Sequence, residues 1–407
     1  MPRRVDFTAD LILVCNSLDA GGIERVVSTL ANEWSSRGLR VCVITQYDRA
    51  RFYSLDPEVH HVVIERGAAG YVAELPSRLK TRIQEMAFMK RRPHKPTSGA
   101  SENTLAESLY RLNFSLLFAY ETRALRRAIE RVDSPLVVSF GTSLNILTLN
   151  ACRGLGRRVV ISERSDGGLQ GWGRLSRRFY DRADVVTANS RGALRGLESF
   201  VDPNKLAFVP NPLVLPNGDG NGAPHAERSP LFLTVGRLVR DKACDVLLDA
   251  FALLGREFDD WRLSIVGGGH LKDSLVAQAE ARGVAPRITW HGIVRDPHAF
   301  YSAASVFVLP SRTEGMPNAL LEAMGSGLPV VVSDGTPGPL ELVEDGVTGL
   351  VVPVDDAAAL ASALARLARD ADLRRRLGGA ASARVRVSEH ELPRALAAWE
   401  SAIGIRR

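Results

Sequence analysis

The sequence of 407 residues has few cysteines and no long apolar run. No run approaches the roughly 20 residues that a membrane-spanning helix needs. The short run Leu11–Cys15 follows Asp6 and Asp10, which argues against a signal peptide. The cysteines lack metal-type spacing, and their apolar neighbours favour buried free thiols in a reducing compartment, so we expect a cytoplasmic protein. These cysteines are Cys15, Cys42, Cys152 and Cys244.

The sequence also lacks the usual marks of a nucleic-acid-binding protein. Its formal net charge is +6, and a basic balance points to polyanionic partners. It contains no zinc-ligand spacing, aromatic–basic RNA motif or basic tail, so nucleic acid is not expected as a partner. An anionic membrane surface is an alternative, which would place the protein peripherally on the inner face of the cell membrane. Scattered, solvated arginine side chains are a third explanation.

The length predicts two domains, because 407 residues exceed what one core usually holds. In the N-terminal half, the pattern predicts a buried strand at Leu11–Cys15, a helix at Ile23–Arg37 and a strand at Leu39–Thr45. This β-α-β order implies a parallel sheet covered by helices. The alternation restarts with a strand at Leu231–Val235. We expect an α/β protein of two doubly wound, Rossmann-like domains that face each other across a cleft.

Two stretches interrupt this alternation. Residues 66–105 combine basic residues with proline, glycine and serine, which predicts an excursion on the surface. Residues 210–230 are rich in asparagine, glycine and proline, which predicts an interdomain linker. The expected divisions are a domain at 1–212, a linker at 213–229, a domain at 230–388 and a final helical segment at 389–407.

The segment Ser311–Val330 contains the most informative pattern. Pro317 suits a first helical turn, which leaves Glu314 in the loop before the helix and Glu322 about two turns in. Free backbone N–H groups over Gly315–Asn318 would form an anion site at the helix N-terminus. Carboxylates accept hydrogen bonds from neighbouring hydroxyls, so the segment suits a ligand with hydroxyls and phosphates, such as a nucleotide sugar. The alternative is a helix with an N-terminal acid and one solvated glutamate.

A second pattern, Val235–Lys242, follows a predicted strand and opens a predicted helix. Arg237 offers a planar fork that matches phosphate oxygens, and Lys242 adds a compact charge. Asp241 is placed to cap the helix. Two cations at a strand-to-helix turn suit a diphosphate leaving group, and ordinary surface cations are the alternative.

Glycines follow two other predicted strands, where they would let a ligand approach the backbone. Gly21 and Gly22 follow the first strand, and Gly267–Gly269 follow a strand that ends at Val266. The second run lacks the last glycine of G-x-G-x-x-G, because Lys272 stands there, so a nicotinamide site is not favoured. Tight turns without a ligand are the alternative at both places.

Taken together, these segments resemble a retaining glycosyltransferase of family 4, with the GT-B architecture. They keep the family's order over nearly the whole chain, and the residues after Glu314 are similar to those of enzymes that build bacterial surface polysaccharides or lipid-linked oligosaccharides. The matching segments are Gly21–Gly22, Asn211–Pro212, Gly236–Arg237 with Lys242, Gly267–Gly269, His291–Gly292 and Glu314–Glu322.

The resemblance implies a division of labour between the domains. The N-terminal domain would bind a glycan or lipid-linked acceptor, and the C-terminal domain would bind the nucleotide sugar, with UDP ahead of GDP. The final helix would cross back onto the N-terminal domain. The expected catalytic residues are Arg237, Lys242 and Glu314. The expected substrate-binding residues are Gly21, Gly22, Gly236, Gly268, Ile293, Val294, Gly315, Met316, Pro317, Asn318 and Glu322.

Particular roles are also implied within that set. Arg237 and Lys242 would hold the diphosphate, Glu322 the ribose and Glu314 the donor sugar, while the backbone at 293–294 would meet the base. Same-face attack by the acceptor would need no protein nucleophile. No metal ion or cofactor is expected, because no Asp-x-Asp lies near the donor motifs.

Two segments depart from the pattern of the family. Ala243 follows Lys242 where the family often has glycine, and Ser139–Ser143 lacks the histidine that many members carry. We therefore assign no catalytic side chain to the N-terminal domain. A nucleotide-sugar epimerase on the same scaffold and a non-catalytic sugar-nucleotide-binding protein remain alternatives.

Basic helical faces in the N-terminal half could meet an anionic membrane or a lipid diphosphate acceptor. Solvated helix faces are the alternative. The basic residues are Arg123, Arg127 and Arg131, then Arg174, Arg177, Arg178 and Arg182, and a cluster at Lys90–Arg92.

Overall fold

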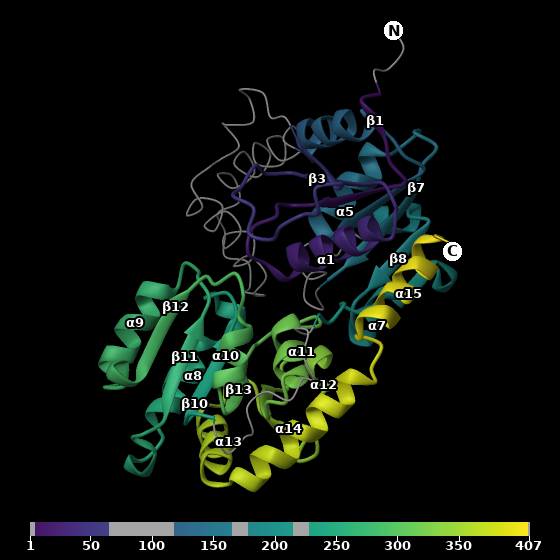
Figure 1. Ribbon diagram of the computed structural model, residues 1–407. Helices are drawn as coiled ribbons and strands as arrows, with labels where there is room; N and C mark the ends of the chain where they lie inside the picture. The colour runs from purple at the N-terminus through teal and green to yellow at the C-terminus, as the bar shows by residue number, and fades with distance from the viewer. Residues whose placement is uncertain (1–4, 65–117, 165–177, 215–227, 406–407) are drawn as a thin grey trace, which may run out of the picture.

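A computed structural model describes residues 5–64, 118–164, 178–214 and 228–405. These residues form two α/β units, one from each half of the chain (Figure 1). Several predicted features lie outside the described residues. They are the excursion at 66–105, most of the linker at 213–229, the cluster Lys90–Arg92, and Arg174 and Arg177.

The N-terminal unit contains a parallel sheet in the order β4-β3-β2-β6-β7-β8-β9. Alternate residues of β2 enter different core clusters, Ile12 and Val14 on one face and Leu11 and Leu13 on the other. A sheet buried on both faces needs near-continuous apolar strands, which the sequence supplies. The strands are β2 Leu11–Cys15, β3 Val41–Thr45, β4 His60–Val63, β6 Leu136–Phe140, β7 Arg158–Glu163, β8 Val185–Ala188 and β9 Leu206–Phe208, and a separate pair is β1 Phe7–Thr8 with β5 Val132–Asp133.

The C-terminal unit repeats this plan, with a parallel sheet in the order β12-β11-β10-β13-β14-β15. The strand order reverses between β10 and β13, and in the other sheet between β2 and β6. Ligands of open α/β sheets collect at the carboxyl ends of strands that meet at such a reversal. The strands are β10 Leu231–Val235, β11 Arg262–Val266, β12 Ile288–Gly292, β13 Val306–Leu309, β14 Val330–Ser333 and β15 Leu350–Val352.

Helices pack on both sheets close to their predicted positions. The apolar face of α1 (Gly22–Ser36), which includes Val27, Leu30 and Trp34, is buried against the N-terminal sheet. The other helices of this unit are α5 Thr142–Ala151 and α7 Arg191–Glu198, with a further helical stretch at 118–130. The C-terminal unit contains α8 Cys244–Ala252, α9 Lys272–Ala281, α10 His298–Ala303, α11 Asn318–Gly325, α12 Pro337–Leu340, α13 Ala357–Arg369 and α14 Ala371–Arg386.

The last helix, α15 (Leu392–Ile403), returns to the N-terminal unit, where Figure 1 shows it beside β8. Leu396, Trp399 and Ile403 enter the core that covers one face of the N-terminal sheet. The indole N–H of Trp399 donates to the carbonyl of Pro210 over 3.1 Å. The chain therefore passes between the units twice, at about residue 212 and again at about residue 390.

Three local predictions were wrong. Helix α11 begins at Asn318 after the non-helical Pro317, so Glu322 lies just over one turn into it, not two. The sequence pattern also predicts two helical stretches from about residue 357 to residue 376, but the second runs on to Arg386 as α14. Asp241 does not cap α8, because the chain first makes a short 3-10 turn and the helix begins after Ala243.

Candidate active site

The predicted cation turn follows β10 and is shaped by an unusual backbone conformation. Arg240–Lys242 form a 3-10 turn, and Ala243 has φ 49° and ψ 37°. This left-handed conformation costs an alanine about 1 kcal/mol more than a glycine. It is a physical reason for the glycine that the family often has at this position.

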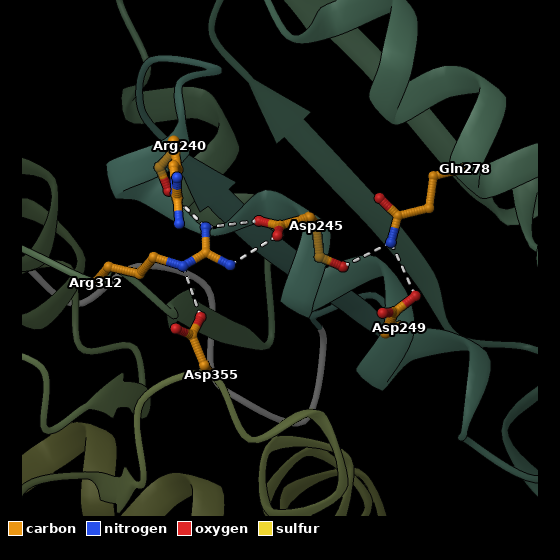
Figure 2. A network of polar contacts seen from close by, with 6 residues as sticks. All are labelled: Arg240, Asp245, Asp249, Gln278, Arg312 and Asp355. Atoms are coloured by element: carbon orange, nitrogen blue, oxygen red, sulfur yellow. Dashed lines mark hydrogen bonds and ion pairs between the residues drawn. The ribbon is translucent and has the colours of Figure 1, made fainter. Parts of the chain in front are cut away.

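Arg312 holds this turn in place from the opposite loop, as Figure 2 shows. Its guanidinium donates to both carboxylate oxygens of Asp245, over 3.0 and 2.7 Å, and to the carbonyl of Arg240 over 2.7 Å. A further bond of 2.6 Å joins Arg312 Nε to Asp355. Burial raises the pKa of the Asp245 carboxyl, but the hydrogen bond and the positive charge of Arg312, together with backbone hydrogen bonds, outweigh burial, so the pKa is lowered. The carboxylate is therefore kept charged, and the turn that carries Lys242 is fixed to the loop that carries Glu314.

Lys242 and Glu314 are in direct contact. Lys242 Nζ forms an ion pair with Glu314 Oε1, and Ser311 Oγ donates to the same oxygen over 2.7 Å. The Glu314 N–H donates to Thr336 Oγ1 over 2.9 Å, which fixes the loop backbone. A small pocket at the carboxyl ends of β10 and β13 is lined by Gly236, Lys242 and Ser311, among others. This is where the strand order reverses, so the predicted cation and carboxylate stand at the expected ligand position.

Glu322 is a buried carboxylate with two partners. Tyr301 donates to Oε2 over 2.9 Å, and Arg25 of α1 lies 2.5 Å from Oε1. Burial raises the pKa of Glu322, while the Arg25 charge and the Tyr301 hydroxyl act to lower it. Because Arg25 belongs to the N-terminal unit, this ion pair joins the two units at the carboxylate predicted to hold ribose.

Arg237 is exposed. Burial raises the pKa of Glu24, and the positive charge of Arg237 acts to lower it, so the two side chains are electrostatically coupled. Glu24 stands just after the Gly21–Gly22 turn. A Cβ on Gly21 would lie 2.1 Å from Glu24 Oε2, so this glycine leaves room for the carboxylate. The charge of the predicted diphosphate cation therefore acts on the carboxylate beside the N-terminal glycine turn.

The glycine run after β11 has a packing explanation. Gly267 has φ 145°, and a Cβ there would lie 1.8 Å from the carbonyl oxygen of Gly236. A Cβ on Gly269 would lie 2.2 Å from the Leu238 carbonyl oxygen. These glycines let the turns after β10 and β11 touch. This packing agrees with the alternative in which the glycine run forms a tight turn.

The residues predicted to meet the base lie beside this turn. A Cβ on Gly268 would lie 2.9 Å from the Ile293 side chain, which is 59% exposed. Val294 is partly buried against the neighbouring core. An exposed apolar side chain therefore lies next to the glycine backbone, an arrangement that suits the planar ring of a nucleotide base.

The rest of the donor loop contacts the N-terminal unit. A Cβ on Gly315 would lie 2.6 Å from the Arg164 carbonyl oxygen, and Asn318 Nδ2 donates to the Gly22 carbonyl over 3.1 Å. Met316 and Pro317 are buried. Glycine at 315 therefore allows close approach of the two units, which the sequence pattern alone did not indicate.

Sequence reasoning missed several residues of this site. Arg25, Tyr301 and Thr336 each contact a predicted site residue, and none was predicted. A basic residue three positions after Gly22 was the available signal for Arg25. No sequence pattern indicated Tyr301 or Thr336, because each lies on a different element from the glutamate that it contacts.

The predicted basic faces are only partly described. Arg123 and Arg127 are exposed on the stretch at 118–130, whereas Arg131 lies 2.6 Å from Asp6. Arg182 lies over the Phe179 ring at 4.6 Å. None of the helices in the described part of the chain has both the length and the hydropathy needed to cross a bilayer. Within the same residues, no three His, Cys, Asp or Glu side chains are grouped so that they could hold a metal ion.

Comparisons with known proteins agree with this architecture. The family model for glycosyl transferases group 1 matches residues 221–384, and the model for the glycosyl transferase 4-like domain matches residues 21–212. A GDP-mannose-dependent alpha-(1-6)-phosphatidylinositol monomannoside mannosyltransferase of Mycobacterium tuberculosis is 30% identical over 280 residues, which are 63% of this chain and 72% of that protein. An alpha-1,4-N-acetyl-D-galactosaminyltransferase of Campylobacter jejuni, named for a diNAcBac-PP-undecaprenol glycan, is 26% identical over 365 residues and 89% of each chain.

Solved structures show the same fold. The crystal structure of Anabaena HepE in complex with UDP and glucose has a TM-score of 0.71 at 17% identity, and the match covers 98% of this chain and 100% of that one. WaaG, a glycosyltransferase involved in lipopolysaccharide biosynthesis, has a TM-score of 0.65 at 17% identity over 97% of this chain and 100% of that one. This chain therefore belongs to the group 1, family 4-like glycosyltransferases and has the GT-B fold.

Proposed function

We propose that the enzyme transfers a hexose or N-acetylhexosamine from a UDP-linked donor to a glycan or lipid-linked acceptor, with retention of anomeric configuration and without a metal ion. The observation that carries this proposal is the contact of Lys242 with Glu314 beside the pocket at β10 and β13. On donor binding, the diphosphate would take the place of Glu314 as the partner of Lys242. The sugar would take the place of Lys242 as the partner of Glu314.

The chemistry follows from where charge develops. Breaking the bond from the anomeric carbon to the diphosphate leaves negative charge on the leaving oxygens. Arg237 and Lys242 would stabilise that charge, and preorganised groups of this kind act most strongly where water is excluded. The acceptor hydroxyl would attack from the same face, held close to the anomeric carbon by the N-terminal unit.

The ribose would bind at Glu322, beside the diphosphate cations. Glu322 is buried and bonded to Tyr301 and Arg25, so a ribose hydroxyl would compete with Arg25 for Oε1. Donor binding would then loosen a contact between the two units.

The relatives support the substrate class. The Campylobacter jejuni relative is named as an N-acetylgalactosaminyltransferase acting on an undecaprenol-linked glycan, and the Mycobacterium tuberculosis relative as a mannosyltransferase acting on a phosphatidylinositol mannoside. Anabaena HepE, which has the same fold, was crystallised with UDP and glucose. We infer a role in surface polysaccharide or lipid-linked glycan synthesis, with peripheral attachment to the inner face of the cell membrane.

A ligand screen followed by an activity assay tests the proposal. We expect UDP-sugars, and not GDP-sugars, to raise the melting temperature of the purified protein, because a ligand that binds only the folded state stabilises it. The best donor should then release UDP only when a glycan or undecaprenyl-diphosphate-linked acceptor is present, in EDTA as without it. NMR of the product should show a retained anomeric configuration. Epimerisation of the donor alone would indicate the epimerase, and stabilisation without turnover would indicate the binding protein.

A further inference from the structure

The hinge between the units is tied together around Asn211. The Leu213 N–H donates to the His390 carbonyl over 2.7 Å, so the two crossings of the chain are joined. His390 Nδ1 lies 3.0 Å from the Asn211 carbonyl oxygen, and since that oxygen only accepts, Nδ1 must carry the proton. The backbone beside Asn211 is therefore fixed by His390, and the Asn211 side chain makes other contacts.

That side chain touches a buried cation. Arg164, at the end of β7, is buried, and its guanidinium lies over the rings of Phe140 and Trp399 at 6.0 and 5.8 Å. Arg164 Nη2 donates to Asn211 Oδ1, and Asn189 Nδ2 donates to the same oxygen over 3.5 Å. Burial lowers the pKa of Arg164 to about 9, so the group is still a cation at neutral pH.

The buried cation sets the direction of every following hydrogen bond. A guanidinium can only donate, so the oxygen of the Asn211 amide must face Arg164 and its NH₂ group must face away. That NH₂ group donates to the Met316 carbonyl over 2.8 Å and to Asn318 Oδ1 over 2.6 Å. The Asn318 amide is oriented in turn, and its NH₂ group donates to the Gly22 carbonyl over 3.1 Å.

This chain of hydrogen bonds reaches the donor loop of the C-terminal unit and the glycine turn of the N-terminal unit. Met316 lies two residues after Glu314, and Asn318 lies one helical turn before Glu322 on α11. Gly22 begins α1, which carries Arg25. A shift of the two bonded loop residues would therefore move both predicted donor carboxylates relative to the N-terminal unit.

We propose that Asn211, oriented by Arg164, is a positioning residue for the donor: it holds the loop Glu314–Asn318 in its binding geometry and joins it to the glycine turn at Gly22. This role rests on the proposed function, since it needs the loop to bind the nucleotide sugar. Asn211 acts through the loop and touches no substrate itself.

Asn211→Asp is the sharpest test. The change keeps the shape and the acceptor for Arg164, but it removes both donated bonds and sets a carboxylate against two oxygens. We expect the KM for the UDP-sugar and the Kd for UDP to rise about tenfold, as for the loss of one or two buried hydrogen bonds, while the acceptor KM stays within about twofold. An equal rise in both KM values, or no rise in the UDP Kd, would overturn the proposal.

Asn145→Asp is the matched control. Asn145 is as buried as Asn211, and its Nδ2 donates to the Ser162 carbonyl over 2.9 Å, with no contact to the donor loop. The same isosteric change should lower the melting temperature and leave the UDP Kd unchanged. An equal loss of UDP affinity in this variant would show that the effect in Asn211→Asp is only structural.

Two further variants keep the test decisive if Asn211→Asp folds poorly. Arg164→Lys keeps a donor-only cation and should retain UDP affinity, whereas Arg164→Met should lose it. Asn318→Ala, at a partly exposed position, should weaken UDP binding as Asn211→Asp does, and the double variant should be no worse than either single one. Fully additive losses of UDP affinity in the double variant, or equal UDP affinity in the two Arg164 variants, would contradict the proposed chain of hydrogen bonds.

The two proposals fail in distinguishable ways. If the unaltered protein binds neither UDP nor any UDP-sugar, the proposed function fails, whatever the variants do. If it binds UDP and Asn211→Asp binds equally well, only the positioning role fails.

Discussion

At the scale of single residues, the site depends on keeping a buried carboxylate charged. Glu322 is 3% exposed, and burial raises its pKa above the ordinary value of 4.5, while the positive charge of Arg25 opposes that rise. A carboxylate is a stronger acceptor for ribose hydroxyls than the neutral acid. Arg25 therefore has two effects, since it occupies Oε1 in this state and also keeps the acid ionised.

The pH dependence of UDP binding follows from that pKa. Affinity should be full above the raised pKa of Glu322 and should be lost as the pH falls through it. Arg25→Met removes a charge that lowers this pKa, so the loss should begin at higher pH than in the unaltered protein. Isothermal titration of UDP across the acidic range measures the midpoint. Arg37→Met, at the far end of α1, is the control, and superimposable profiles for Arg25→Met would refute this reasoning.

The gap between the predicted and the observed site also shows at this scale. Glu314, Glu322, Arg237 and Lys242 could be predicted because their types and spacing carry chemistry. The contact of Arg25 with Glu322 could not be predicted, although a basic residue stands three positions after Gly22, because it depends on where α1 meets α11.

At the scale of elements, the turn before α8 shows how a loop can fix a catalytic side chain. Arg312 bonds Asp245, Asp355 and the Arg240 carbonyl, so the 3-10 turn and the donor loop move together (Figure 2). Lys242 is the last residue of that turn. Its position against Glu314 therefore depends on Arg312, which no motif singled out.

Arg312→Lys tests this dependence. Lysine keeps the charge but cannot bond both oxygens of Asp245, so the turn should loosen and kcat for transfer should fall about tenfold, as when about 1.4 kcal/mol of barrier stabilisation is lost. Arg369→Lys breaks a similar pair with Glu257, exposed and outside the site, and should leave kcat unchanged. Equal rates for both variants in a UDP-release assay would show that the turn does not need Arg312.

Most strands and helices could be predicted from apolar periodicity, because a parallel sheet buried on both faces leaves a clear pattern. The start of α11 and the 3-10 turn could not. Both depend on backbone conformations at Pro317 and Ala243 that tertiary contacts impose. The predicted Asp241 cap was wrong for the same reason, since Ala243, and not Asp241, is the N-cap residue of α8.

At the scale of the whole molecule, the fold and the family could be predicted, because the order of motifs extends over nearly the whole chain. The contacts between the units could not. The Arg25–Glu322 pair, the bonds from Asn211 to the donor loop and the close approach at Gly315 each join residues more than 100 positions apart. The domain boundary at 212–230 stays a prediction, because most of those residues lie outside the described part of the chain.

The central claim is that one pocket binds an activated sugar through its diphosphate and its sugar ring. The initial rate of sugar transfer by purified Lys242→Ala and Glu314→Ala tests it most directly, with Lys272→Ala, an exposed lysine on α9, as the control. We predict a fall of about 100- to 1,000-fold in both site variants, as expected when one preorganised group is removed, with an unchanged circular dichroism spectrum and a normal rate for the control. Near-normal transfer by either folded site variant would contradict the claim.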